Sequence, residues 1–110
     1  RNGTVYHFVQ NSDTAYHAGV VTSPKYSNAA SIGIEQTHRD GIDAWPSIQV
    51  QRTAQIVASL RQSYGDIPAK SHAEIASPKG RKSDPTHFPW EYFSQEVEVA
   101  MNDTWTFQKI

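Results

Sequence analysis

The chain has 110 residues, which is enough for one domain at most. Ten lysines and arginines against 11 aspartates and glutamates give a formal net charge of −1, so the sequence lacks the basic excess typical of proteins that bind nucleic acid. The absence of cysteine excludes a disulfide framework and cysteine ligands for a metal, and no apolar run approaches the roughly 20 residues of a membrane-spanning helix. We therefore expect no nucleic-acid partner and no membrane span.

The first part of the chain is predicted to contain two short strands separated by a loop. Residues 4–9 follow an Asn-Gly turn signal and are rich in β-branched and aromatic side chains, which predicts the second arm of a hairpin. Residues 11–30 are rich in serine, aspartate and asparagine and are predicted to be loop. Residues 30–35 are predicted to form a strand that ends at Glu35, and Gly33 within it is expected to permit the close approach of backbone or of a ligand.

The rest of the chain is predicted to contain two helices with a short strand and a loop between them. Apolar residues recur at helical spacing across residues 46–64, with a proline near the start and a glycine after the end. Residues 70–74 are predicted to be a strand that brings His72 to the edge of a sheet. Residues 89–101 are predicted to be a second helix, and residues 102–110 a linker or the start of a following segment.

The segment from residue 72 to residue 85 combines side chains that bind metals and anions in one loop. It contains the imidazole of His72, the ammonium of Lys82 and the carboxylate of Asp84. Neutral imidazole nitrogen and carboxylate oxygen are ordinary zinc ligands, and a lysine beside them is suited to hold a developing oxyanion. Proline, glycine, serine and lysine in such numbers are also typical of an ordinary solvated loop with an incidental histidine.

This loop resembles the zinc-binding signature of the type 2 N-acetylmuramoyl-L-alanine amidases, a superfamily that includes phage lysozyme-like amidases and peptidoglycan recognition proteins. The signature is roughly Gly-His-Ser-Asp-Ile-Ala-Pro-Gly-Arg-Lys-x-Asp-Pro-Gly, followed by Phe-x-Trp. In this chain, residues 71–76 are Ser-His-Ala-Glu-Ile-Ala, residues 78–85 are Pro-Lys-Gly-Arg-Lys-Ser-Asp-Pro, and residues 88–90 are Phe-Pro-Trp. The departures, such as Glu74 where the family has aspartate, leave the ligand types intact and change the loop around them.

Three blocks upstream resemble the same family in the same order. Residues 1–6, Arg-Asn-Gly-Thr-Val-Tyr, resemble its Arg-Asp-Gly-Thr-Ile-Tyr hairpin, and residues 15–19, Ala-Tyr-His-Ala-Gly, resemble its Trp-His-Ala-Gly block. Residues 31–35, Ser-Ile-Gly-Ile-Glu, resemble its Ser-Ile-Gly-Ile-Glu strand. The resemblance thus extends from the first residue to about residue 93.

The resemblance implies an α/β fold: a mixed central β-sheet flanked by helices, like that of amidases and peptidoglycan recognition proteins. The family's first zinc ligand is a histidine in an N-terminal His-His-Thr strand, and this chain has no counterpart of that block. Residues 1–101 are therefore predicted to be the C-terminal two-thirds of an amidase catalytic domain, truncated at its N-terminus. A second chain is an alternative source of the missing segment and of the third zinc ligand.

The resemblance also implies the roles of individual residues. His72 and Asp84 are expected to bind Zn²⁺, Glu35 to act as general base, and Lys82 to stabilise the tetrahedral oxyanion. Each has a plainer interpretation: a structural histidine, a turn-forming aspartate before proline, an exposed strand carboxylate and a solvated lysine. Contacts with the substrate are expected from five further residues: His17, Asn28, Arg81, His87 and Trp90.

The implied reaction is hydrolysis of the amide between N-acetylmuramic acid and the L-alanine of the stem peptide, by a zinc-activated water. The substrate would be peptidoglycan or a muropeptide, so the protein is expected to act on the cell wall, with recycling of muropeptides in the cytoplasm as an alternative. The 110-residue chain alone is expected to be inactive. One alternative is a module that binds peptidoglycan without cutting it. Another is a structural domain in which His72 and Asp84 merely form a hydrogen bond with each other.

Overall fold

A computed structural model describes residues 2–102 of the chain and divides it into two compact units. The helical unit comprises Arg1–Val5, Ile42–Ala69 and His87–Ile110. The loop unit comprises Tyr6–Gly41 and Lys70–Thr86.

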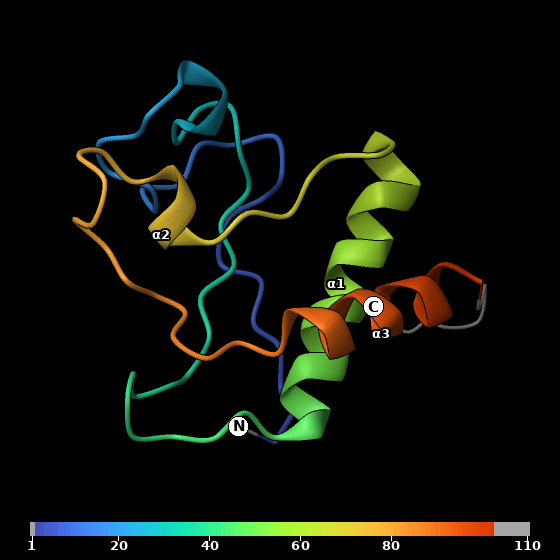
Figure 1. The fold of residues 1–110 in the computed structure, drawn as a ribbon. Helices are drawn as coiled ribbons and strands as arrows, with labels where there is room; N and C mark the ends of the chain where they lie inside the picture. Colours follow the sequence, from blue (N-terminus) through green and yellow to red (C-terminus); the bar gives the residue numbers. More distant parts are fainter. Residues whose placement is uncertain (1, 103–110) are drawn as a thin grey trace. The chain divides into compact units, whose positions relative to one another are not determined.

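Four short or medium helices make up the regular structure of residues 2–102 (Figure 1). Two of them, α1 and α3, belong to the helical unit, and the 3₁₀ turn η1 and the single turn α2 belong to the loop unit. Their bounds are η1 (Pro24–Tyr26), α1 (Ser47–Tyr64), α2 (His72–Ile75) and α3 (Trp90–Met101).

Helices α1 and α3 confirm the two helices predicted from the sequence. Helix α1 begins directly after Pro46 and ends at Gly65, whose φ of 85° is in the left-handed region and whose N–H donates to the carbonyl of Arg61. Glycine adopts this conformation without the steric cost of a Cβ, which explains the end of the helix. The periodicity and both boundary residues are local signals, so the sequence alone was sufficient.

The core of the helical unit forms where α1 and α3 pack together. Helix α1 contributes a face of small residues, including Ala54 and Ala58, which are fully buried. Helix α3 sets larger side chains against it at a spacing of three to four residues. The buried core comprises Val50, Ala54, Val57, Ala58, Phe88, Phe93, Val97 and Ala100.

Four aromatic rings close this core at the start of α3. The ring of Phe88 lies edge-on to those of Trp45, Trp90 and Phe93, with centroids 5.0, 4.8 and 5.3 Å away. Edge-to-face geometry at these distances adds an attraction beyond the burial of area. Phe88 is itself buried, so it anchors the segment that precedes α3.

The predicted α/β fold with a mixed central sheet is wrong for residues 2–102. In place of strands, the described residues contain one isolated antiparallel bridge, between Val21 and Ala76. Residues 4–9 and 30–35 have the composition of strands but pair with no neighbouring strand in this part of the chain. β-Propensity describes a fit to a paired, half-buried surface, so composition alone does not produce a strand.

The predicted strand at residues 70–74 is also wrong, because the chain forms the single turn α2 there. Ser71 and Glu74 make a capping box: the Ser71 hydroxyl accepts from the Glu74 N–H at 3.0 Å, and a Glu74 carboxylate oxygen accepts from the Ser71 N–H at 3.0 Å. These reciprocal bonds satisfy two donors that the helix leaves unpaired. His72 is therefore held at the start of a capped turn.

Two further expectations concern the ends of the chain and the membrane. The predicted linker, residues 102–110, lies outside the described residues except for Asn102. Among the described helices, none is long and apolar enough to cross a membrane.

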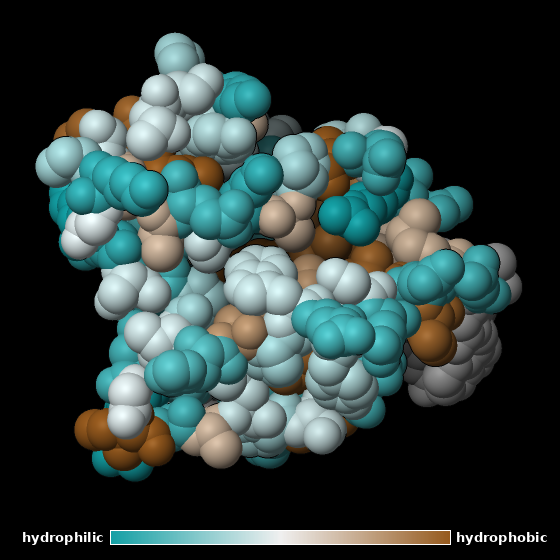
Figure 2. Space-filling view, in the orientation of Figure 1, coloured by the Kyte–Doolittle hydropathy of each residue, from teal (hydrophilic) through white to brown (hydrophobic). Residues whose placement is uncertain are grey.

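Large apolar side chains remain exposed at the surface of both units. Brown residues interrupt a mainly teal and pale face in Figure 2. In the loop unit, Tyr6 and Phe8 are mostly exposed and stack on each other, with ring centroids 5.9 Å apart. Their exposure agrees with the absence of a paired strand at residues 4–9.

A matched pair of substitutions in α3 tests the core. Val97 is buried and Val99 is 60% exposed. Val97→Ala should lower the free energy of unfolding by about 2 kcal/mol, because two buried methyl groups lose their contacts and leave a cavity. Val99→Ala should change it by less than about 0.5 kcal/mol. Urea unfolding measures both, and equal losses would contradict the α1–α3 packing.

Candidate functional site

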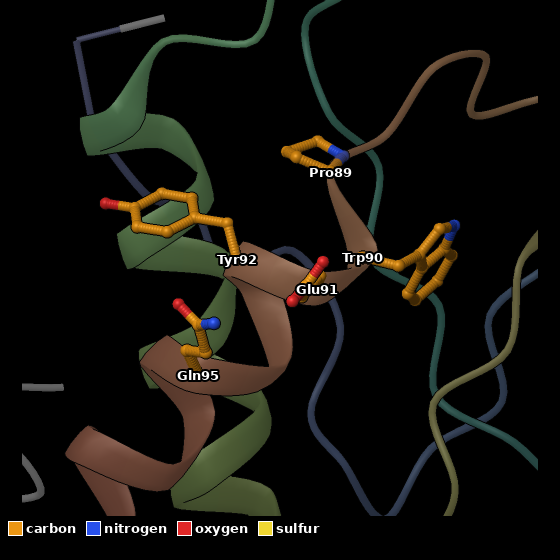
Figure 3. A pocket seen from close by; sticks show the side chains of 5 residues that line it. All are labelled: Pro89, Trp90, Glu91, Tyr92 and Gln95. Atoms are coloured by element: carbon orange, nitrogen blue, oxygen red, sulfur yellow. The ribbon is translucent and has the colours of Figure 1, made fainter.

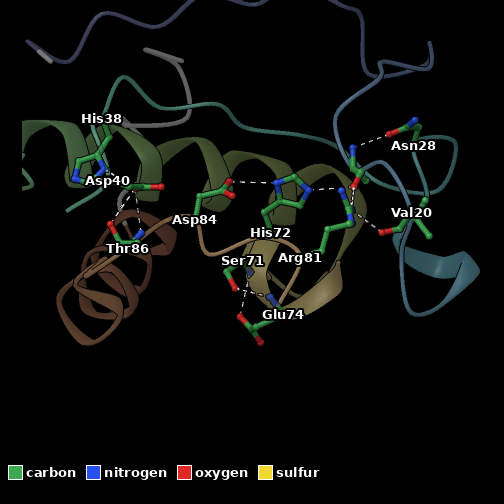
Figure 4. A network of polar contacts seen from close by, with 11 residues as sticks. Val20, Asn28, His38, Asp40, Ser71, His72, Glu74, Arg81, Asp84 and Thr86 are labelled. Carbon is green, nitrogen blue, oxygen red and sulfur yellow. Dashed lines mark hydrogen bonds and ion pairs between the residues drawn. The ribbon is translucent and has the colours of Figure 1, made fainter. Parts of the chain in front are cut away.

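The loop unit brings the two predicted metal ligands together. The Nδ1 atom of His72 lies 3.2 Å from Oδ2 of Asp84, although twelve positions separate the two residues in the chain (Figure 4). The side chain of His72 is 22% exposed and that of Asp84 is 46% exposed. The pair is therefore accessible from solvent while its histidine is mostly enclosed.

Backbone hydrogen bonds fix the positions of His72 and Asp84 relative to each other. The N–H of Ala73 donates to the carbonyl of Asp84 at 3.0 Å, which ties α2 to the loop that returns beside it. The capping box of Ser71 and Glu74 fixes the start of the same turn. Both constraints act on the backbone next to a candidate ligand, so the two side chains are oriented by the fold of the loop.

The other ring nitrogen of His72 faces a carbonyl. Nε2 lies 3.0 Å from the carbonyl oxygen of Ala18, and a carbonyl only accepts hydrogen bonds. Nε2 must therefore carry the proton. In the neutral imidazole, Nδ1 then presents its lone pair to Asp84.

Asn28 and His17 shape the segment that carries this carbonyl. The side-chain oxygen of Asn28 accepts from the backbone N–H of His17 at 2.9 Å and from that of Ala18 at 2.8 Å. The ring nitrogens of His17 lie 2.9 Å from the carbonyl of Ala15 and 2.9 Å from the hydroxyl of Ser31. The structure thus engages both expected substrate contacts in bonds within the loop unit.

Another group does lie close to Gly33, but it is the imidazole of His17 and not the backbone or ligand that the sequence led us to expect. A Cβ on Gly33 would lie 2.5 Å from Cγ of His17, a distance that no side chain tolerates. The glycine thus lets residues 31–35 pass directly against the ring.

Arg81 lies in the zinc-signature loop, residues 72–85, and its side chain reaches the segment that contains Ala18. Its Nη2 donates to the carbonyls of Ala18 and Val20, and its Nε donates to the carbonyl of Ser77. Residues 20–22 and 75–77 also exchange two backbone hydrogen bonds of 2.9 Å around the Val21–Ala76 bridge. The guanidinium reinforces this pairing.

The two expected catalytic residues lie in the loop unit but are not joined to the ligand pair. Glu35 and Lys82 are exposed, and within residues 2–102 no hydrogen bond or ion pair links either of them to His72 or Asp84. Their side chains are available to solvent.

The remaining two candidates, His87 and Trp90, belong to the helical unit. His87 has a positive φ of 53° and an exposed side chain. Trp90 lines a shallow hollow of about 450 Å³ at the start of α3. Figure 3 shows its five lining residues, Pro89, Trp90, Glu91, Tyr92 and Gln95. The proposed metal ligands are not among them.

An anchor that the sequence analysis missed lies two residues beyond Asp84. Oδ1 of Asp40 accepts from the hydroxyl of Thr86 at 3.0 Å, from its N–H at 3.3 Å and from Nδ1 of His38 at 3.0 Å. The bonds from Thr86, and to a lesser degree the nearby His38 imidazole, hold the pKa of Asp40 below the ordinary range of an aspartate. The anchor therefore fastens the end of the zinc-signature loop to residues 38–41, and no sequence spacing signalled it.

A catalytic zinc ion requires three protein ligands and an open position. Residues 2–102 contain no group of three or more histidine, cysteine, aspartate or glutamate side chains placed to hold a metal. The described part of the chain therefore offers the His72–Asp84 pair and not a complete three-ligand site.

Comparison with known proteins decides the family. A family profile described as N-acetylmuramoyl-L-alanine amidase matches residues 1–87, which include His72, Asp84 and the anchor at Asp40. The chain belongs to the N-acetylmuramoyl-L-alanine amidase family. Comparisons with curated proteins and with solved structures gave no match. In this member of the family, the match and the geometry of the loop unit concern the same residues.

The Asp40 anchor predicts how acid weakens the loop unit. Because the pKa of Asp40 is lowered by folding, its stabilising contribution is complete above the pKa of the unfolded chain and is lost as pH falls through the folded pKa. Thr86→Val removes one of the donors, so the pKa of Asp40 should rise toward the ordinary range. Carboxyl ¹³C shifts against pH measure it, with the exposed Thr14→Val as control. An unchanged Asp40 pKa in Thr86→Val would contradict the anchor.

Proposed function

We propose that this chain is the part of an N-acetylmuramoyl-L-alanine amidase that carries two zinc ligands, His72 and Asp84. The reaction is hydrolysis of the amide between N-acetylmuramic acid and the L-alanine of the stem peptide, so the substrate is peptidoglycan or a muropeptide. One observation carries the proposal: in a chain of this family, Nδ1 of His72 lies 3.2 Å from Oδ2 of Asp84, and Nε2 faces the carbonyl of Ala18.

The His72–Asp84 pair fits a zinc ion on two counts. With Nε2 protonated, the lone pair of Nδ1 and a carboxylate oxygen face each other, and a cation is needed between two such acceptors. In addition, a tetrahedral zinc with bonds of about 2.0–2.1 Å separates its ligand atoms by about 3.3 Å, close to the observed distance. A histidine that binds metal through one nitrogen and donates the other N–H to a carbonyl is the usual arrangement.

A third protein ligand is needed to complete a catalytic site, because such sites use three ligands and an open position. Residues 2–102 provide no third candidate placed to join the pair. We propose that the third ligand lies outside the described residues, in a further segment of the protein or on a second chain. Two ligands alone should bind zinc weakly, so residues 1–110 alone should be inactive.

The exposed side chains of Glu35 and Lys82 are assigned to the chemistry. Zinc, when bound, would supply an acidified water and a polarised scissile carbonyl. Glu35 would accept a proton from the attacking water and return it to the L-alanine nitrogen as the C–N bond breaks. The ammonium of Lys82 would lie beside the carbonyl oxygen as it becomes negative. His87 and Trp90 remain proposed contacts for the glycan or the peptide.

Substitutions of these two residues test the proposal in the protein that contains the third ligand. Lys82→Ala should lower turnover by about 10²–10³ while zinc content is retained, because the ammonium acts on the transition state. Glu35→Gln should lower turnover and leave muropeptide affinity unchanged. The assay counts free L-alanine amines released from purified peptidoglycan, with the exposed neighbour Lys79→Ala as control. Parental turnover in either variant would remove that residue from the mechanism.

A module that binds peptidoglycan without cutting it is the second candidate. It is favoured by the finding that the described residues provide two ligands and not three. The same assay separates the candidates: binding of muropeptide with no release of amine in the three-ligand protein would favour the binding module.

A further inference from the structure

Arg81 contacts the carbonyl that orients His72. Its Nη2 donates to the carbonyl of Ala18 at 3.3 Å and to that of Val20 at 2.8 Å, and its Nε donates to the carbonyl of Ser77 at 2.8 Å. A guanidinium has five N–H donors, and three of them are used here on the backbone. The carbonyl oxygen of Ala18 thus accepts hydrogen bonds from both Nη2 of Arg81 and Nε2 of His72.

Gly19 makes this contact sterically feasible. It has a φ of 65°, and a Cβ at this position would lie 3.2 Å from Nη2 and 3.4 Å from Nη1 of Arg81. The guanidinium therefore lies close against the bare Cα, between the two carbonyls that it binds. Any larger residue would strain the backbone and crowd the guanidinium.

We infer that Arg81 is a positioning residue for His72: it holds the carbonyl of Ala18 where that oxygen accepts the Nε2–H, and so keeps Nδ1 directed at Asp84. The inference rests on the proposed function, because a metal ion is what the oriented Nδ1 would serve. Within residues 2–102, the hydrogen bonds of the Arg81 side chain go to backbone carbonyls and to neither proposed ligand, so it acts through the backbone of residues 18–20.

The alternative role for Arg81 is only to stabilise the pairing of two backbone segments. The same three bonds support the pairing of residues 20–22 with 75–77. If Arg81 only braced this pairing, its loss would lower the fraction of folded molecules and leave the folded ones unchanged. Positioning predicts a defect in molecules that are folded, which separates the two roles.

The test compares Arg81→Gln with Lys79→Gln, which removes a cation from the same loop without touching the Ala18 carbonyl. Zinc affinity is measured by competition with a chelator, under conditions in which urea titration shows each variant to be folded. Arg81→Gln should bind zinc about 10–100 times more weakly, the usual effect of losing a group that orients a metal ligand. Lys79→Gln should match the parent.

A second readout follows the ring itself in the metal-free chain. Long-range ¹H–¹⁵N spectra should show a protected Nε2–H on His72 in the parent and in Lys79→Gln, and rapid exchange of that proton in Arg81→Gln. If Arg81→Gln does not fold, Arg81→Lys takes its place, because one ammonium cannot satisfy three carbonyls in the geometry of a guanidinium.

The outcomes separate the inference from the function on which it rests. Parental zinc affinity and a protected Nε2–H in folded Arg81→Gln would overturn the positioning role and leave the zinc site intact. A parent that binds zinc no better than His72→Ala would overturn the zinc site. In that case, loss of the protected Nε2–H in Arg81→Gln would still support the action of Arg81 on the ring.

Discussion

The carbonyl oxygen of Ala18 accepts the Nε2–H of His72, and the orientation of the candidate ligand pair depends on this hydrogen bond. It fixes which ring nitrogen carries the proton and leaves the other nitrogen facing Asp84. Ala18 is buried, and its N–H donates to the side-chain oxygen of Asn28. Its carbonyl oxygen also accepts a hydrogen bond from Arg81. A backbone acceptor held on both sides is well suited to orient an imidazole, because it has no rotamers of its own.

Three residues expected to contact the substrate make hydrogen bonds within the loop unit, close to this carbonyl. Asn28 and His17 hold residues 15–18 in place, and Arg81 holds residues 18–20. Side chains of the same types are used to bind sugars and carboxylates, so residue type does not distinguish the two roles. In this structure the partners of these side chains include backbone carbonyls and N–H groups of the loop unit, so a substrate-binding role for them stays a prediction.

The two long helices could be predicted from the sequence because their signals are local. The repeat of apolar residues in α1 and the glycine at its end require no knowledge of distant contacts. The strands could not be predicted in the same way, because a strand depends on a partner elsewhere, and residues 4–9 and 30–35 pair with none in the described chain. The turn α2 was missed because four residues are too few for a helical period, although Ser71 and Glu74 carry the capping-box pattern.

The candidate site was predictable in part. The zinc signature identified His72 and Asp84 as partners, and the structure places them in contact. The Ala18 carbonyl and the Asp40–Thr86 anchor were not predictable, since one is a backbone atom and the other joins residues 46 positions apart. A motif of side chains contains no information on backbone acceptors. The orientation of the His72 ring therefore follows only from the three-dimensional structure.

Two cations are able to occupy the space between Nδ1 of His72 and Oδ2 of Asp84: a proton, which gives an ordinary ion pair, or a metal. Titration of ¹⁵N-histidine-labelled protein with Zn²⁺ distinguishes them most directly. If the pair binds zinc, the metal should shift the Nδ1 resonance of His72 and leave Nε2 protonated on the carbonyl of Ala18, and Asp84→Asn should weaken this response. Unchanged ¹⁵N shifts of the His72 ring on addition of zinc, or binding of zinc through Nε2, would contradict the proposed zinc site.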